Sequence, residues 1–171
     1  MHECKCRMKD LDSYLNDHLA GSVAALELIA HCAHLYKGIP LGAFFSEIEA
    51  QIATDQDTLR DLMRRLGVEE SKARQAGAWA GEKLGRVLFT LAGNEPDGLG
   101  VLLVLEGLIM GVAGKRLLWR ALSAADLLEL EEFDFKELQR RAEEQIKRAQ
   151  AEQIQSARRA LVDAGLWRGD S

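Results

Sequence analysis

The sequence HLYKGIPLGAFF, residues 34–45, sets the architecture because it contains a signal to end one helix and a signal to begin the next. Glycine is favoured just after the last turn of a helix, so Gly38 predicts the end of a helix over residues 10–37. Proline suits the first turn of a helix, and Pro40 predicts the start of a second helix over residues 41–66. Only about three residues separate the two, and a connection that short makes them antiparallel neighbours.

Each of these two helices has apolar residues at the spacing of an amphipathic helix, which gives it one buried side. On the first helix that side comprises Leu11, Leu15, Leu19, Leu26, Ile29, Ala33 and Tyr36. On the second helix it comprises Phe45, Ile48, Ile52, Leu59, Met63 and Leu66. The two sides predict a shared hydrophobic core.

The sequence AGNEPDG, residues 92–98, is a loop because it combines glycine, asparagine, proline and aspartate. Residues 70–91 before it are rich in alanine and glycine and predict a shorter helix. At about 1.5 Å per residue this helix spans roughly 30 Å, one bundle length, and can act as a crossover. Residues 99–122 after the loop predict another long helix.

The chain then turns back once more. Residues 123–133 form a connection with room for a short helical turn. Asp134, with Glu137 three residues later, has the pattern of a capping box and opens a last helix that runs to about Ala164. The expected organisation is a flexible leader at residues 1–9, one helical domain at 10–165 and a C-terminal tail at 166–171.

The composition supports an all-α bundle of four long helices plus the shorter crossover helix. The chain has 171 residues, 47% of them hydrophobic and only 6% aromatic, which disfavours a β-sandwich or barrel. Its net charge of −5 gives no general attraction to nucleic acid or to an anionic membrane. The most apolar run, residues 99–113, is too short to span a bilayer. Its three cysteines do not form a disulfide framework, and they favour a reducing, cytoplasmic location.

Two helical hairpins joined by a long crossover resemble the ferritin-like superfamily. The distinctive motif of that family is a Glu on the first and third bundle helices and Glu-x-x-His on the second and fourth. Glu27 and Glu106 match the first and third positions by residue type, but the second and fourth helices contain no histidine. The resemblance therefore implies a ferritin-like up-down bundle with a degenerate di-iron motif. The oxidase and iron-storage chemistry of the family does not carry over.

Several polar residues are predicted to lie near the core. His18 and Ser22 fall within the apolar side of the first helix, while Glu27 lies roughly 120° from the centre of that side, beside Asn16 and His34, which weakens it as a core ligand. Asp55 lies on the apolar side of the second helix. Because a buried carboxylate needs a partner, we expect Asp55 to be hydrogen-bonded to Ser22 or His18 across the hairpin.

Glu106 is the only charged residue between residues 99 and 114. It shares one side of the predicted helix with Leu99, Leu103, Met110 and Leu117, and we expect that side to be buried. A buried carboxylate there requires a cation, a metal or a proton. The candidate cations are Lys83, Lys115, Arg140, Arg141 and Arg148.

Glycines also recur along this helix, and their absent side chains predict close packing against a neighbouring helix. They are Gly100, Gly107, Gly111 and Gly114, and the expected neighbour carries Gly77, Gly81 and Gly85.

Two functions fit these features. The first is a non-enzymatic, cytoplasmic bundle without a cofactor that acts through its helical surfaces, as a homo-oligomer or with a protein partner. The second is a divergent metalloprotein with oxidoreductase or metal-handling activity. Its Fe or Mn would be bound by Glu106, Asp55, His18 and Glu27.

Overall fold

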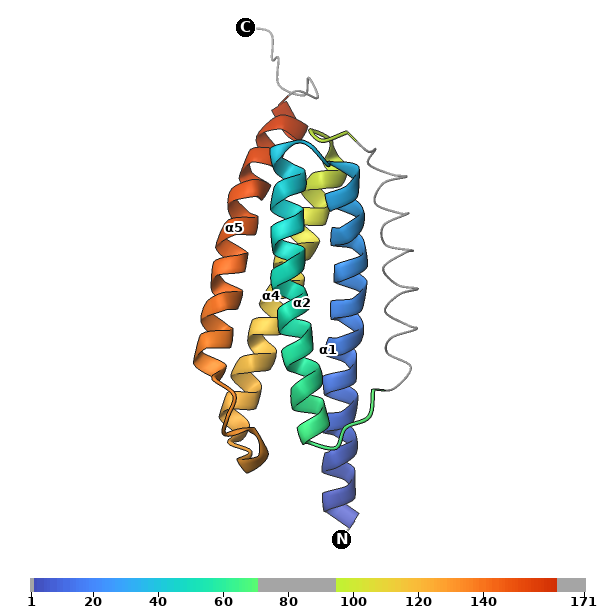
Figure 1. Ribbon diagram of the computed structural model, residues 1–171, viewed down its shortest axis with the longest axis vertical. Helices are drawn as coiled ribbons and strands as arrows, with labels where there is room; N and C mark the ends of the chain where they lie inside the picture. The colour runs from blue at the N-terminus through green and yellow to red at the C-terminus, as the bar shows by residue number, and fades with distance from the viewer. Residues whose placement is uncertain (1, 71–94, 163–171) are drawn as a thin grey trace, which may run out of the picture.

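The computed structural model describes residues 2–70 and 95–162, which form an all-α arrangement without β-strands in that part of the chain (Figure 1). The long helices are α1 (His2–Leu35), α2 (Pro40–Arg65), α4 (Leu99–Ala125) and α5 (Phe135–Val162). A short 3-10 turn, η1 (Leu128–Leu130), lies between α4 and α5. The expected crossover over residues 70–91 and the expected tail at 166–171 lie almost entirely outside the described residues.

The helices form two hairpins that pack side by side. The most extensive contacts are within each hairpin, α1 on α2 and α4 on α5. The hairpins meet through α1 with α4 and through α2 with α5. As Figure 1 shows, α4 begins at the end of the bundle where α1 and α2 are joined, so α2 and α4 run in the same direction.

The connection between α1 and α2 follows the predicted chemistry. Gly38 has φ +92°, a conformation that favours glycine, and Pro40 is the first residue of α2. Gly67, with φ +67°, plays the same part after α2. The start of α1 differs from the expectation, because the helix begins at His2 rather than near residue 10. No glycine or proline occurs between these positions to stop the helix from extending into the expected leader.

The core consists of two hydrophobic clusters, one toward each end of the bundle. One contains Ile29, Phe45 and Leu105, and the other contains Leu15, Leu62 and Trp119. The predicted apolar sides of the first two helices are confirmed, since all their residues are buried or packed against a cluster. Cys32 is buried in the first cluster, and burial raises the pKa of its thiol to about 12.

The predicted buried side of α4 is wrong. Met110 is 70% exposed, Leu117 54% and Leu99 45%, and Glu106 is exposed as well. The opposite side enters the core instead, through the buried residues Val101, Val104, Leu105, Leu108, Val112 and Trp119. The hydrophobic pattern cannot choose between the two sides, because the first four turns of α4 are apolar or glycine all round apart from Glu106.

Three of the predicted glycines of α4 do not closely approach a helix in the described part of the chain, whereas Gly100 is buried. A Cβ atom added at Gly107, Gly111 or Gly114 would meet no described atom within 4 Å. The predicted neighbour, with Gly77, Gly81 and Gly85, lies outside the described residues.

The predicted cap of α5 is confirmed, because an Asp134 carboxylate oxygen accepts a hydrogen bond of 2.9 Å from the Glu137 backbone N–H. The Glu137 side chain does not complete the reciprocal box and binds Arg140 instead. We expect Asp134→Ala to lower the free energy of unfolding by about 1 kcal/mol, the usual cost of a lost N-cap. Urea denaturation measures this, with Asp134→Asn as the control that keeps the cap. Equal stability of the two variants would contradict the assignment.

Candidate functional site

The most unusual feature of the interior is a carboxylate buried where the two hairpins meet. Asp55 of α2 is 1% exposed. Its Oδ2 lies 2.5 Å from Lys115 Nζ of α4 and accepts a 2.9 Å hydrogen bond from Gln145 Nε2 of α5. Its Oδ1 lies 2.6 Å from Arg141 Nη2 of α5, in an ion pair without hydrogen-bond alignment. Both oxygens are therefore engaged by groups of the other hairpin.

Lys115 closes the arrangement, because its Nζ also donates a 2.6 Å hydrogen bond to Gln145 Oε1. The Gln145 side chain is thus a donor to Asp55 and an acceptor from Lys115. The cluster contains one carboxylate and two cations, so it carries an excess positive charge. Its carboxylate oxygens face cationic and amide donors rather than an open position.

A second polar contact lies beside it and involves the first helix. Gln56, next to Asp55 in α2, donates a 2.8 Å hydrogen bond to Ser22 Oγ of α1, and the Ser22 hydroxyl donates to the Leu19 carbonyl. Together these residues form a layer to which all the long helices contribute. We call it the polar layer; it comprises Ser22, Asp55, Gln56, Lys115, Arg141 and Gln145.

The helical positions explain why the layer lies between the two core clusters. Asp55 lies between Ile52 of one cluster and Leu59 of the other. On α4, Lys115 lies between Val112 and Trp119, again one from each cluster. Spacings of three and four residues keep these side chains on one side of a helix. The polar residues therefore occupy core positions rather than surface ones.

Burial lowers the pKa of Lys115 from its usual value, against the opposing attraction of Asp55, and Arg141 lowers it further. Between the lowered pKa and the usual lysine value of about 10.4, the unfolded chain binds the proton more strongly than the folded one, so stability rises with pH. We expect the wild type to gain stability relative to Lys115→Met as the pH is raised from about 7 to about 10. Urea denaturation of both proteins across this range measures the difference. If the wild type instead loses stability relative to Lys115→Met as the pH rises, the attraction of Asp55 outweighs burial and raises the pKa of Lys115.

The sequence correctly placed Asp55 in the interior but assigned it the wrong partners. Ser22 binds the adjacent Gln56, and Asp55 binds residues of α4 and α5. Lys115 and Arg141, predicted as possible partners of Glu106, pair with Asp55 instead. Gln145 was missed, although it lies between Ala142 and Ala149 on the buried side of α5.

The other predicted site residues do not join this cluster. Glu106 is exposed, and among the described residues it accepts only a long 3.4 Å hydrogen bond from Gln153, so the expectation that it is buried beside a cation is wrong. Glu27 is exposed on α1. His18 is partly buried against the Tyr14 ring, at 4.8 Å between ring centroids, and burial lowers its pKa despite the nearby Asp17. Within residues 2–70 and 95–162, no three His, Cys, Asp or Glu side chains gather into a possible metal site.

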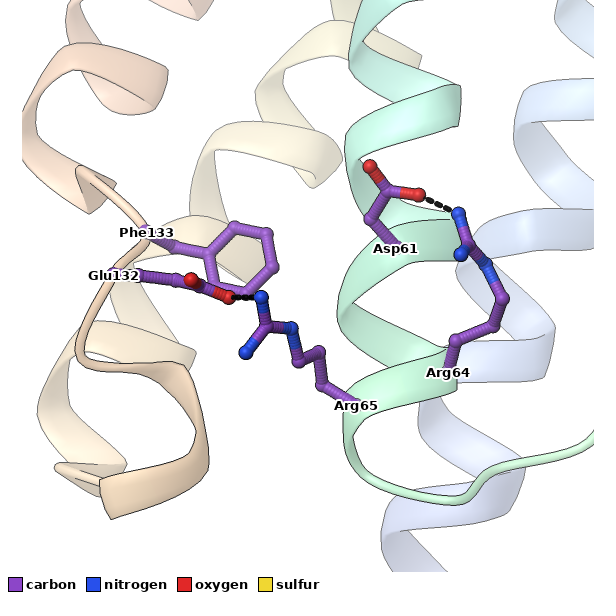
Figure 2. A pocket seen from close by; sticks show the side chains of 5 residues that line it. All are labelled: Asp61, Arg64, Arg65, Glu132 and Phe133. Carbon is purple, nitrogen blue, oxygen red and sulfur yellow. Dashed lines mark hydrogen bonds and ion pairs between the residues drawn. The ribbon is translucent and has the colours of Figure 1, made fainter.

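A surface depression of about 450 Å³ lies at the end of the bundle where α2 stops (Figure 2). Arg64 and Arg65 line it together with Asp61, Glu132 and Phe133. Figure 2 shows that Arg64 pairs with Asp61 and that Arg65 pairs with Glu132 across the gap to the α4–α5 connection. The arginines are already neutralised, so the depression has no excess charge with which to hold an anion.

Comparisons of the chain with protein-family models, with curated proteins and with solved structures give no match. Among the helices of the described part, none combines the length and the apolar character needed to cross a membrane.

Proposed function

We propose that the chain is a non-enzymatic helical-bundle protein that acts by binding protein through its helical surfaces, without a di-iron centre. The observation that supports the absence of a di-iron centre is that other side chains of the bundle already contact both Asp55 oxygens. They are Lys115, Arg141 and Gln145, and a metal at this carboxylate would have to displace two cations. The exposed positions of Glu106 and Glu27 support the same conclusion, since neither can join Asp55 inside the bundle.

The proposal includes a ferritin-like arrangement of the helices and a cytoplasmic location. The arrangement is supported by two antiparallel hairpins whose α2 and α4 run in the same direction, as a long crossover requires. The location is supported by cysteine usage, with Cys32 buried as a free thiol.

Elemental analysis of protein purified from iron- and manganese-supplemented cells tests the proposal. We expect no stoichiometric metal and a melting temperature that a chelator leaves unchanged, because no binding energy would be lost. A stoichiometric metal in the wild type that is lost in Asp55→Ala and kept in Asp57→Ala would overturn the proposal. Asp57 is the matched control because it is an exposed aspartate on the same helix.

A further inference from the structure

The side of α4 that faces away from the core is apolar and unpartnered by described residues. Met110, Leu117 and Leu99 are the most exposed large side chains along it, and Leu103 is half-buried between them. Their spacings of four and seven residues place them in one stripe along the helix. A helix that is apolar on both sides is normally covered on both. The stripe therefore has the character of a contact surface.

Two opposite charges flank this stripe. Glu106 and Arg120 are both exposed, and neither forms an ion pair with a described residue. They lie fourteen residues apart, about four helical turns or roughly 21 Å, which puts them on the same flank of the stripe. One helix thus carries an acid toward its start and a base toward its end, separated by apolar residues.

We propose that two copies of this chain associate through the α4 stripe, with the two α4 helices antiparallel about a two-fold axis near Ala113. This inference rests on the proposed function, because it specifies the surface and the partner through which the protein acts. A two-fold axis brings a surface against itself, so a self-complementary pattern is required. The charges of α4 have that pattern, because Glu106 of each copy lies opposite Arg120 of the second copy.

The apolar residues match in the same alignment. With the axis near Ala113, Met110 of one copy lies at the height of Leu117 of the second copy, and the reverse pair forms on the other side of the axis. The glycines add room beside this contact, since no described atom lies within 4 Å of an added Cβ at Gly107, Gly111 or Gly114. A parallel pairing about a two-fold axis along the helices would instead bring Glu106 to the height of Glu106 and Arg120 to the height of Arg120, on opposite flanks of the contact, so no opposite charges would meet.

The first experiment measures the mass of the full-length protein in solution by light scattering and sedimentation. We expect a dimer, and we expect Met110→Lys to raise the dimer dissociation constant about tenfold or more, because two lysines would enter the apolar contact. Ile154→Lys is the matched control. Ile154 is 49% exposed on α5, outside the stripe, and its substitution should leave the dimer intact. A monomeric wild type, or equal effects of the two substitutions, would overturn the proposal.

Charge reversal tests the pairing itself. Glu106→Arg alone and Arg120→Glu alone should each weaken the dimer, because each places like charges opposite each other at both ends of the contact. The double variant Glu106→Arg with Arg120→Glu should recover the dimer, since it restores opposite charges. Additive weakening in the double variant would contradict the alignment.

Disulfide cross-linking fixes the direction of the helices in a background with Cys4, Cys6 and Cys32 replaced by serine. A mixture of Met110→Cys and Leu117→Cys proteins should cross-link on oxidation, whereas either protein alone should not. Efficient cross-linking of each protein with itself would indicate parallel helices. If the protein is a monomer and its Met110→Cys thiol reacts slowly with a thiol reagent, residues 71–94 cover the stripe. If the protein is a monomer and the same thiol reacts fast, the stripe is uncovered and its partner is a different protein. The parallel result would overturn the antiparallel alignment, and either monomer result would overturn the dimer. None of them bears on metal content, which tests the proposed function separately.

Discussion

Asp55→Ala is expected to lower the free energy of unfolding by about 3–5 kcal/mol, because removing one partner of a buried ion pair leaves the others uncompensated. Lys115 and Arg141 would lose the only carboxylate that they contact among the described residues. The Lys115 side chain is only 13% exposed and the Arg141 side chain 29%, so water compensates the loss poorly. Gln145 would also lose the acceptor of its 2.9 Å hydrogen bond. Urea denaturation at pH 7 measures the loss, provided that the dependence of the free energy of unfolding on urea concentration is the same in both proteins, as two-state unfolding requires.

Asp57→Ala is the matched control for this experiment. The Asp57 side chain is 75% exposed and pairs only with Arg60, at 3.4 Å, among the described residues. Exposed ion pairs of this kind contribute little, so the change should stay within about 0.5 kcal/mol. A loss below about 1 kcal/mol for Asp55→Ala would show that water reaches the polar layer and screens its charges.

Gly42→Ala is expected to cost about 3 kcal/mol, at the upper end of the usual range for overpacking. A Cβ atom at this position in the first turn of α2 would lie 2.1 Å from the Tyr36 carbonyl oxygen and 2.6 Å from its carbonyl carbon. Both obstacles are backbone atoms, so no side chain can rotate away to make room. The clash must be relieved by moving the connection that contains Gly38 and Pro40.

Gly21→Ala provides the opposite outcome on the neighbouring helix. Gly21 lies inside α1, and an added Cβ would meet no described atom within 4 Å. Its replacement should therefore raise stability by up to about 1 kcal/mol through helix propensity alone. Thermal and urea denaturation of the two variants give the comparison. Equal effects of the two substitutions would mean that the α1–α2 connection relaxes without cost.

Several helix ends, although not the start of α1, could be predicted from the sequence because each depends on residues close to it. Gly38 and Pro40 set one boundary through backbone conformation, and Asp134 set another through a local hydrogen bond. The orientation of α4 could not be predicted in this way. Its first turns are apolar or glycine in every direction, and a residue past its middle, Lys115, is the one that identifies the inner side.

The candidate site could be predicted only in part for a related reason. Asp55 was recognisable as a core residue because it lies between Ile52 and Leu59 on a strongly amphipathic helix. Its partners belong to the other hairpin, and their height relative to Asp55 depends on how the two hairpins pack. The short connection near Gly38 fixes heights only between α1 and α2, which is why the sequence suggested Ser22 and His18.

The polar layer has a consequence for the register of the hairpins. Leucine, isoleucine and alanine repeat along α2 and α5, and such surfaces still interdigitate after a slip of one helical turn, about 5.4 Å. Asp55 does not tolerate that slip, because Arg141 and Gln145 are one turn apart on α5 and must both reach it at once. A shifted bundle would bury a charge without its partners, at a cost of about 3–5 kcal/mol. We infer that the layer selects one sliding position among several that the hydrophobic core alone would accept.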